Sequence, residues 1–188
     1  MAVLPIRISG DPVLHSATMP VTEFTRSLHT LVDDMYETMA EAPGVGLAAP
    51  QVGVARRLFV YNFTDDDATL WRGVAINPTL LITPTPIGEP DEDDESEGCL
   101  SLPGERFPLR RSARAVLRAV DLDQKPFEID SQGWLARIFQ HEFDHLDGVL
   151  YTDRLAHDHA KAANKAVRKR QWGVPGLSWL PGADHLEG

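Results

Sequence analysis

The residues with the clearest chemical potential lie between Gln140 and Gly148. This stretch reads Gln-His-Glu-Phe-Asp-His-Leu-Asp-Gly and contains the pattern His-Glu-x-x-His. Residues four apart lie on the same face of a helix, so His141 and His145 could bind one metal ion, with Glu142 beside a water molecule on that ion. Histidines at this spacing also occur by chance, so the hypothesis of a metal site requires a further ligand.

A catalytic metal of the zinc type usually has three protein ligands and one open position. Tyr151 stands where metzincins carry a third histidine, and no glutamate except the penultimate residue follows Glu142. His157 and His159, on another predicted helix, remain as alternatives. Cys99 is the only cysteine, and catalytic sites that combine cysteine and histidine ligands with an open position are known. We therefore expect Cys99 to be the third ligand.

Such a site would make the chain a hydrolase of a carbonyl compound. The metal makes water more acidic, and Glu142 can accept the proton that the water releases. The reaction also needs hydrogen-bond donors for the negative charge that develops on the carbonyl oxygen. We expect these donors to be the side-chain amide of Gln51 and the backbone N–H of Leu100, the residue after the cysteine.

Gln51 lies in a stretch of small residues at 44–53, which reads GVGLAAPQVG. Small side chains allow another backbone to approach closely. One interpretation is a tight loop packed beneath a sheet. The other is a rail for a peptide substrate, with Gln51 directed at the reacting group. A phosphate-binding loop is excluded, because the Walker lysine is absent and the glycine spacing is not that of a Rossmann motif.

The elements that must position these residues follow from hydrophobic spacing. Apolar residues at helical spacing predict helices over 23–41, 132–147 and from about 153 to 171. Aromatic and branched residues predict strands at 58–62, 74–77 and 80–82, with a sheet edge or a bend at Pro78. A hairpin is expected over 115–121 and 126–129. The acidic stretch before Glu97 predicts a solvated loop, and residues 174–188 predict a surface tail.

Length and composition indicate a single globular domain over residues 1–188. The formal net charge of −10 argues against binding to DNA and to nucleic acids in general, which requires a cationic surface. No apolar run is long enough for a transmembrane helix, and the first residues lack the pattern of a signal peptide. A cytoplasmic protein without a membrane role is therefore expected.

Three segments together carry a family resemblance: GVGLAAPQVG at 44–53, EGCLSLPG at 97–104 and QHEFDHLDG at 140–148. In content, order and separation they resemble the motifs of peptide deformylases. The acidic loop before Glu97 and the tail rich in Pro, Gly and Trp resemble the actinobacterial branch of that family. The resemblance implies an α+β fold. Mixed and antiparallel sheets would surround a central helix that carries the two histidines, with a further helix near each terminus.

The resemblance also implies a metal-dependent amidase that removes the formyl group from the N-terminal formyl-methionine of new bacterial proteins and releases formate. Cys99, His141 and His145 match the metal ligands of the family, and Glu142 matches its general base and acid. The implied native metal is one Fe²⁺ ion, with Zn²⁺, Ni²⁺ or Co²⁺ as substitutes. The implied partners are formyl-methionine nascent peptides, and the basic face of the last predicted helix suggests a ribosome contact.

Gln51 and the Leu100 N–H match the groups that stabilise the oxyanion in the family. Arg137 departs from the family pattern, because a basic side chain stands one turn before His141, where an apolar one is common. This departure concerns the rim of the methionine pocket and leaves the chemistry intact. The residues expected to bind the substrate, by backbone pairing or around the pocket, are Val45, Gly46, Glu97, Arg106, Trp134 and Ile138.

Two other functions compete with this interpretation. A metalloprotease that cuts internal peptide bonds would need a third ligand downstream of the histidines, and Tyr151 does not provide one. A binding module without catalytic activity would not need the complete set of predicted metal ligands together with Glu142 and Gln51. Both alternatives therefore explain less of the sequence than a deformylase does.

Overall fold

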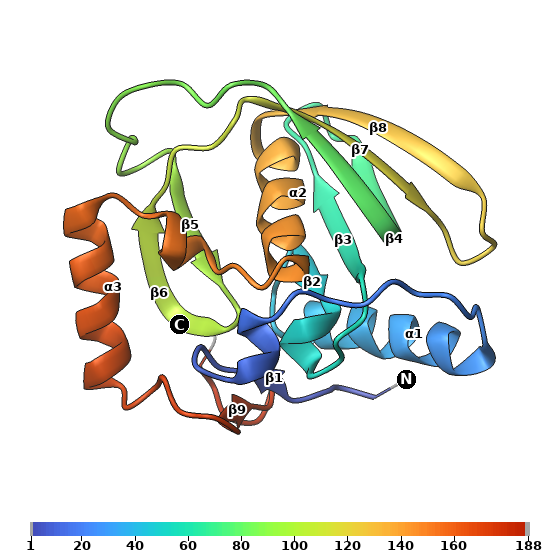
Figure 1. The fold of residues 1–188 in the computed structure, drawn as a ribbon, viewed down its shortest axis with the longest axis horizontal. Coiled ribbons are helices and arrows are strands. Elements are labelled where there is room, and N and C mark those ends of the chain that lie inside the picture. Colours follow the sequence, from blue (N-terminus) through green and yellow to red (C-terminus); the bar gives the residue numbers. More distant parts are fainter. Residues whose placement is uncertain (1, 187–188) are drawn as a thin grey trace.

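The largest sheet of the molecule has five antiparallel strands in the order β2-β3-β4-β7-β8 (Figure 1). The computed structural model describes residues 2–186. The strands of this sheet are β2 (Gly46–Ala48), β3 (Leu58–Thr64), β4 (Leu70–Ile82), β7 (Arg114–Val120) and β8 (Pro126–Gln132). Two smaller antiparallel sheets pair β1 (Ile6–Arg7) with β9 (Ser178–Trp179) and β5 (Ser96–Cys99) with β6 (Leu102–Pro108).

The helices are α1 (Arg26–Glu41), α2 (Gly133–Leu146) and α3 (His157–Lys169). Short 3₁₀ helices lie at Pro12–His15, Ala49–Val52 and Tyr151–Arg154. The expected α+β class is confirmed, and all pairs between these strands are antiparallel, so the sheets are antiparallel rather than mixed. Among residues 2–186, no helix combines the length and the apolar composition that a bilayer crossing requires.

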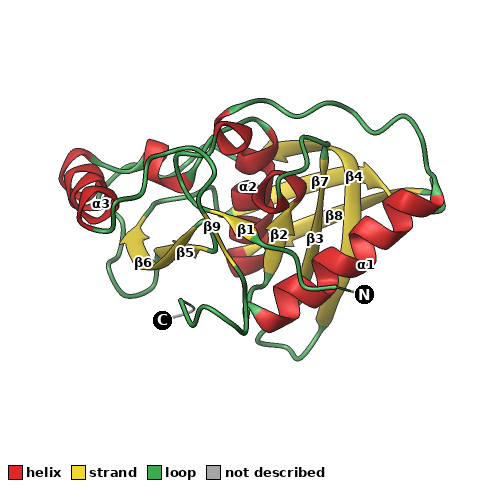
Figure 2. Cartoon of the chain, turned by 90° about the horizontal axis from the view of Figure 1, so that it is seen from below, coloured by secondary structure: helices red, strands yellow, loops and turns green. Residues whose placement is uncertain are grey.

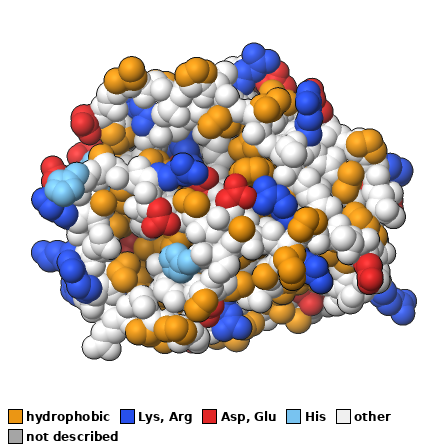
Figure 3. All heavy atoms as spheres, viewed as in Figure 1, with side chains coloured by type: hydrophobic (Ala, Val, Ile, Leu, Met, Phe, Trp, Pro, Cys, Tyr) orange, Lys and Arg blue, Asp and Glu red, His pale blue; other side chains and the backbone are white. Residues whose placement is uncertain are grey.

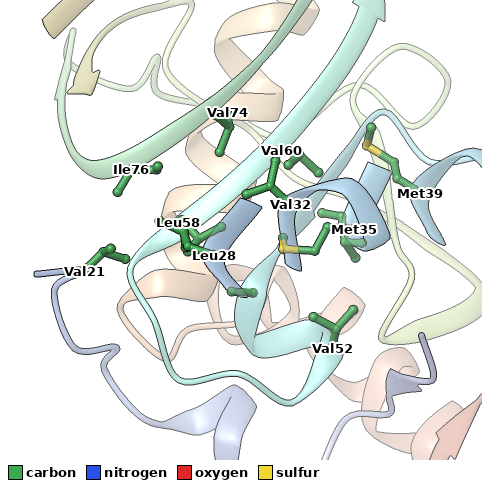
Figure 4. Packing of buried hydrophobic residues seen from close by; sticks show 12 residues of the cluster. Val21, Leu28, Val32, Met35, Met39, Val52, Leu58, Val60, Val74 and Ile76 are labelled. Atoms are coloured by element: carbon green, nitrogen blue, oxygen red, sulfur yellow. The ribbon is translucent and has the colours of Figure 1, made fainter. Parts of the chain in front are cut away.

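α1 and α2 cover opposite faces of the five-stranded sheet (Figure 2). β3 can pack against both helices because it carries apolar side chains on both of its faces. Successive side chains of a strand point to opposite faces. Leu58 and Val60 pack with α1, whereas Phe59 and Tyr61 pack with α2. Figure 4 shows the α1 side of this arrangement, where Met35 lies among the branched side chains of the strands. Burial on both faces explains the uninterrupted apolar run of β3.

α2 carries the histidine motif and lies between the five-stranded sheet and the β5–β6 hairpin (Figure 1). The helix begins at Gly133 and ends before Gly148, whose φ of +74° turns the chain at little conformational cost. Its apolar residues recur at helical spacing and are buried against the sheet: Leu135, Ile138, Phe139 and Leu146. Because this apolar side faces the sheet, the other side of the helix, which carries His141 and His145, faces β5.

The predicted helices and the hairpin are confirmed, with shorter ends for the last helix, which begins at His157. The two strand segments predicted around Pro78 form one continuous strand, β4, which lies inside the sheet between β3 and β7. Pro78 is tolerated there because the register shifts between Ile76 and Thr79, and Asn77 adopts a φ of 51°. At a bulge of this kind, the neighbouring strand does not require a hydrogen bond from the position of the proline, which has no backbone N–H.

The expectation of a surface tail fails at Trp179. β9 pairs with β1 at the other end of the chain, and only 1% of Trp179 is exposed. Its ring packs in a cluster with Ile6, Ile8 and Ala42. Residues 174–186 are therefore fixed to the body of the protein by a buried aromatic anchor.

Candidate active site

The structure brings Cys99, His141 and His145 together. Cys99 ends β5, and the histidines lie on successive turns of α2. One ligand atom from each residue lies within 4.8 Å of the others, and Cys99 Sγ is 3.3 Å from His145 Nε2. Ligands of one ion have such separations, since metal–sulfur and metal–nitrogen bonds measure about 2.3 and 2.0–2.1 Å. His157 and His159, the alternatives considered above, lie on α3 outside this group.

The surroundings of the two histidines fit a metal ion. Glu97 Oε2 lies 3.0 Å from His141 Nδ1, so Nε2 of that ring is the nitrogen available to a metal. Glu142 Oε2 and His145 Nδ1 are buried without a hydrogen-bond partner among the described residues. Buried polar atoms normally have partners, so Glu142 Oε2 marks a place for a bound species, whereas His145 Nδ1 lies on the other side of its ring from the Nε2 that faces Cys99. A thiolate with two imidazoles is a donor set that suits divalent transition metals.

Glu97 is the centre of a buried ionic network. Arg111 donates to both carboxylate oxygens at 2.8 and 2.9 Å, and Arg137 Nη1 donates to Oε1 at 2.7 Å. Arg111 also donates to Asp144 at 2.6 Å. Arg111, Arg137 and His141 contact both oxygens of Glu97, and only 3% of Glu97 is exposed. The carboxylate is placed to orient His141. A contact of Glu97 with substrate stays a prediction.

The pKa values of the two buried carboxylates of the site shift in opposite directions, because their partners differ. Burial would raise the pKa of Glu97, but the hydrogen bonds and charges of His141 and Arg111 lower that pKa well below its usual value. Burial raises the pKa of Glu142 to about 7, since this side chain has no comparable set of cationic partners. Burial also lowers the pKa of His145 well below its usual value, with help from the charge of His141. A neutral His145 is the form that binds metals.

Gln51 lies directly beside the cysteine. Its Oε1 accepts a hydrogen bond from the Ala48 N–H at 2.8 Å, which fixes the orientation of the amide. The amide nitrogen then faces Cys99 Sγ at 3.6 Å and Ser101 Oγ at 3.4 Å. Gln51 lies where the second interpretation of residues 44–53 expects it, and the binding of a peptide along this stretch stays a prediction. The stretch forms the edge strand β2 and the 3₁₀ turn after it, and the turn directs Gln51 at the site.

β2 passes Glu142 so closely that its first residue must be glycine. A Cβ on Gly46 would lie 2.4 Å from Glu142 Oε1. β2 pairs only with β3 inside the sheet, so its other edge faces the site. Val45, just before this strand, is 45% exposed. A backbone edge that is open to an extended peptide therefore lies next to the buried carboxylate.

A cavity of about 400 Å³ contains most of the predicted site residues. Trp134 and Ile138 line it from α2, and Arg106 lines it from β6. The departure at Arg137 is explained by its contacts, because its guanidinium lies 5.2 Å from the ring centre of Trp134 and bonds to Glu97. The predicted site residues that line the cavity are Val45, Gly46, Gln51, Glu97, Cys99, Leu100, Arg106, Trp134, Ile138, His141 and Glu142.

Sequence reasoning missed three residues around this site. Arg111 and Asp144 form a buried ion pair beneath the predicted metal ligands, and Asp144 also binds Arg154 at 2.6 and 2.7 Å. The sequence could have pointed to Asp144, because an acidic residue between the two histidines of a buried helix must have a cationic or hydrogen-bonding partner. No comparable signal marked Trp179, which lines the cavity from the C-terminal segment.

Similarity to known proteins decides which family has this geometry. The family model described as polypeptide deformylase matches residues 3–161. The chain belongs to the peptide deformylase family. The peptide deformylase of Mycolicibacterium smegmatis is 51% identical over an alignment of 189 positions, which covers 97% of this chain and 96% of the relative. This relative confirms the likeness to the actinobacterial branch.

Solved structures agree with this assignment. The peptide deformylase of Legionella pneumophila has 37% sequence identity and a TM-score of 0.77, covering 90% of this chain and 96% of that chain. The peptide deformylase of Acinetobacter baumannii, solved with Met-Ala-Ser bound, has 34% identity and a TM-score of 0.71, covering 81% and 98%. Membership of this family favours a deformylase over the metalloprotease and the binding module weighed above.

Replacement of Glu97 by glutamine tests its role in orienting His141. The variant leaves two buried arginines short of negative charge, so we expect unfolding free energy to fall by about 3 kcal/mol. Metal affinity should fall about 10–100-fold, because the partner that orients a ligand is weakened. Denaturant unfolding and metal titration measure the two effects.

The matched control is Glu95→Gln. Glu95 pairs with Arg110 and Arg137 rather than with His141. This control should lose less stability and keep its metal affinity. Equal metal affinities for Glu97→Gln and the unmodified protein would contradict the role given to Glu97.

Proposed function

We propose that the chain hydrolyses the N-formyl group of formyl-methionine at the start of nascent polypeptides and releases formate. The observation that carries this proposal is the convergence of Cys99, His141 and His145 on one point. Glu142 and Gln51 lie beside that point, next to the open edge of β2. Residues 1–188 are proposed to work as one catalytic unit, since the C-terminal segment packs against the loop that follows Cys99.

The metal ion is proposed to be held by Cys99, His141 and His145, and to be Fe²⁺ in the native protein. When bound, it supplies Lewis acidity, which polarises a carbonyl oxygen and makes water more acidic. The donor set alone does not select iron, because these ligands bind several divalent metals and cellular availability decides among them. The identification of iron therefore rests on the family resemblance and needs its own test.

Glu142 is proposed to act first as base and then as acid. It accepts a proton from the attacking water and delivers it to the amine that leaves when the C–N bond breaks. Its raised pKa, about 7, places both protonation states within easy reach at neutral pH. Gln51 and the Leu100 N–H are proposed to donate hydrogen bonds to the carbonyl oxygen as negative charge develops on it. The fixed amide of Gln51 supports this role, because its nitrogen already faces the site.

The substrate is proposed to bind as an added strand along β2. Val45 and Gly46 would supply backbone hydrogen bonds, and pockets between strand and helix would select side chains. Trp134 and Ile138 are proposed to line the pocket for the methionine side chain, and Arg106 to lie near its mouth. The binding of Met-Ala-Ser to the Acinetobacter relative supports a site for a peptide with methionine first.

A second proposal concerns α3 and the ribosome. Lys161, Lys165, Arg168 and Lys169 are exposed on this helix, although the net charge of the chain is −10. Figure 3 shows Lys and Arg side chains gathered at the left edge of the molecule, where Figure 1 places α3. A local cationic surface of this kind suits the phosphates of ribosomal RNA.

Co-sedimentation with ribosomes checks the second proposal. We expect binding that weakens steeply as salt is raised, because phosphate contacts release counterions. The double variant Lys165→Glu, Arg168→Glu should lose this binding and keep full activity on a free formyl peptide. Binding that is absent, or that does not depend on salt, would contradict a contact through α3.

Replacement of Glu142 by glutamine tests the proton transfer. The amide fits the same space beside Gly46 but cannot carry the proton, so kcat for formate release should fall by about 10²–10⁴-fold. Metal content should stay near one ion per chain. Glu128→Gln, on the exposed face of β8, is the control and should retain full activity. A Glu142→Gln variant with near-normal kcat would show that another group moves the proton.

Exposure to air tests the proposal of iron. A thiolate beside Fe²⁺ is prone to oxidation, so activity should decay faster in air than under anaerobic conditions. Protein reloaded with Ni²⁺ should keep its activity in air. Formate release, measured over time together with metal analysis of the same sample, gives the two half-lives. Equal half-lives for the native metal would count against iron.

A further inference from the structure

The C-terminal segment, residues 174–186, forms part of the cavity wall. This segment lies beyond residue 161, where the match to the family model ends. Trp179 lines the cavity together with Leu100, Pro103 and Gly104. Figure 1 shows that β9, the strand that contains Trp179, lies beside β1 near the turn of the β5–β6 hairpin. A segment outside the matched region therefore borders the substrate site.

Trp179 makes one directed contact with the catalytic loop. Its indole Nε1–H donates to the backbone carbonyl of Leu100 at 2.8 Å, and the ring is 1% exposed. The next carbonyl of the loop, that of Ser101, accepts from the Ser9 N–H at 2.8 Å. The Ile8 N–H in turn donates to the Leu177 carbonyl at 3.0 Å. The small β1–β9 sheet and its flanks thus hold two successive carbonyls of the loop.

The other side of this loop is held by the metal-ligand cluster. Cys99 Sγ accepts from the Ser101 N–H at 3.4 Å and faces the amide of Gln51. The side chain of Leu100 packs close to Gly44, so that a Cβ there would lie 2.9 Å from its Cδ1. With its carbonyl, its side chain and both neighbours fixed, Leu100 has little rotational freedom left. The direction of its N–H is then fixed as well.

We infer that Trp179 is a positioning residue for the reaction, which holds the Leu100 N–H in place through the Leu100 carbonyl. The inference rests on the proposed function, in which this N–H stabilises the oxyanion. Loss of an oxyanion donor typically costs about 10²–10³-fold in kcat, and a donor that is misdirected but present should cost less. We expect removal of the indole N–H to lower kcat roughly tenfold.

A role in packing alone makes a different prediction. Trp179 fills a hydrophobic cluster with Ile6, Ile8 and Ala42, so a smaller residue would lower stability even without any effect on catalysis. A packing defect lowers the melting temperature and the folded fraction but leaves the kcat of folded molecules unchanged. A lost wall contact, by contrast, raises KM for the longer peptides. A fall in kcat that is equal for short and long peptides is specific to the positioning role.

The test is Trp179→Phe, assayed for formate release from formyl-Met-Ala and formyl-Met-Ala-Ser, with metal content and melting temperature of the same samples. We expect kcat to fall roughly tenfold for both peptides, with KM changed less than about twofold and metal content unchanged. Trp172→Phe is the control, since Trp172 packs in the same cluster and stacks with Arg170. It should keep the kcat of the unmodified protein.

A second variant removes the N–H without changing the shape of the ring. Incorporation of 3-benzothienylalanine at position 179 replaces the indole N–H by sulfur, so the cluster stays filled. The same loss of kcat is expected, even where Trp179→Phe fails to fold. An unchanged kcat in this variant, or a loss confined to KM, overturns the inference. Absence of formate release from the unmodified protein would instead contradict the proposed function.

Discussion

One buried carboxylate, that of Glu97, joins the parts of the active site. A charge removed from water is costly unless other charges and hydrogen bonds compensate it. Glu97 meets this requirement with His141, Arg111 and Arg137, which come from α2 and from the segment after β6. The same contacts fix β5 against α2. Cys99, two residues further along β5, is thereby brought opposite His145, although the two are 46 residues apart in sequence.

Different surroundings give Glu97 and Glu142 different pKa values and suit them to different roles. Glu97 is surrounded by cationic groups and stays ionised, which suits a residue that orients the proposed metal ligand His141. Glu142 lies next to Gly46 in a buried position without such partners, and its pKa of about 7 suits a residue that moves a proton. Two carboxylates in different surroundings commonly take different roles in this way. Gly46 keeps the Glu142 carboxylate in this buried position, since any larger residue there would displace it.

The parts of the site that follow local patterns could be predicted from the sequence. The spacing of His141 and His145 requires only a helix, and the apolar stripe of α2 supplied that prediction. Cys99 followed from the lack of any better third ligand. The network beneath these residues could not be predicted, because Arg111 and Asp144 are brought together by folding rather than by spacing. The contacts of Glu97 with buried arginines could not be predicted for the same reason, since its place beside the cysteine motif suggested only a nearby substrate.

The C-terminal segment was the least predictable part of the fold. Its proline and glycine residues indicate loop structure, and Trp179 gave no periodic signal. Its burial depends on pairing with β1 at the opposite end of the chain, a contact that no local pattern reports. The strand through Pro78 shows the same limit on a smaller scale. Proline indicated an interruption there, but the five-stranded sheet accommodates it with a register shift.

The proposed chemistry depends on one sulfur and two nitrogens from this chain that hold a single metal ion. X-ray absorption spectroscopy on protein purified without oxygen measures these ligands directly. We expect one sulfur neighbour at about 2.3 Å and two imidazole nitrogens at about 2.0–2.1 Å in a Zn²⁺-loaded sample, with the sulfur signal lost in Cys99→Ser. A metal shell without sulfur in the unmodified protein, or one unchanged in Cys99→Ser, would contradict this set of ligands.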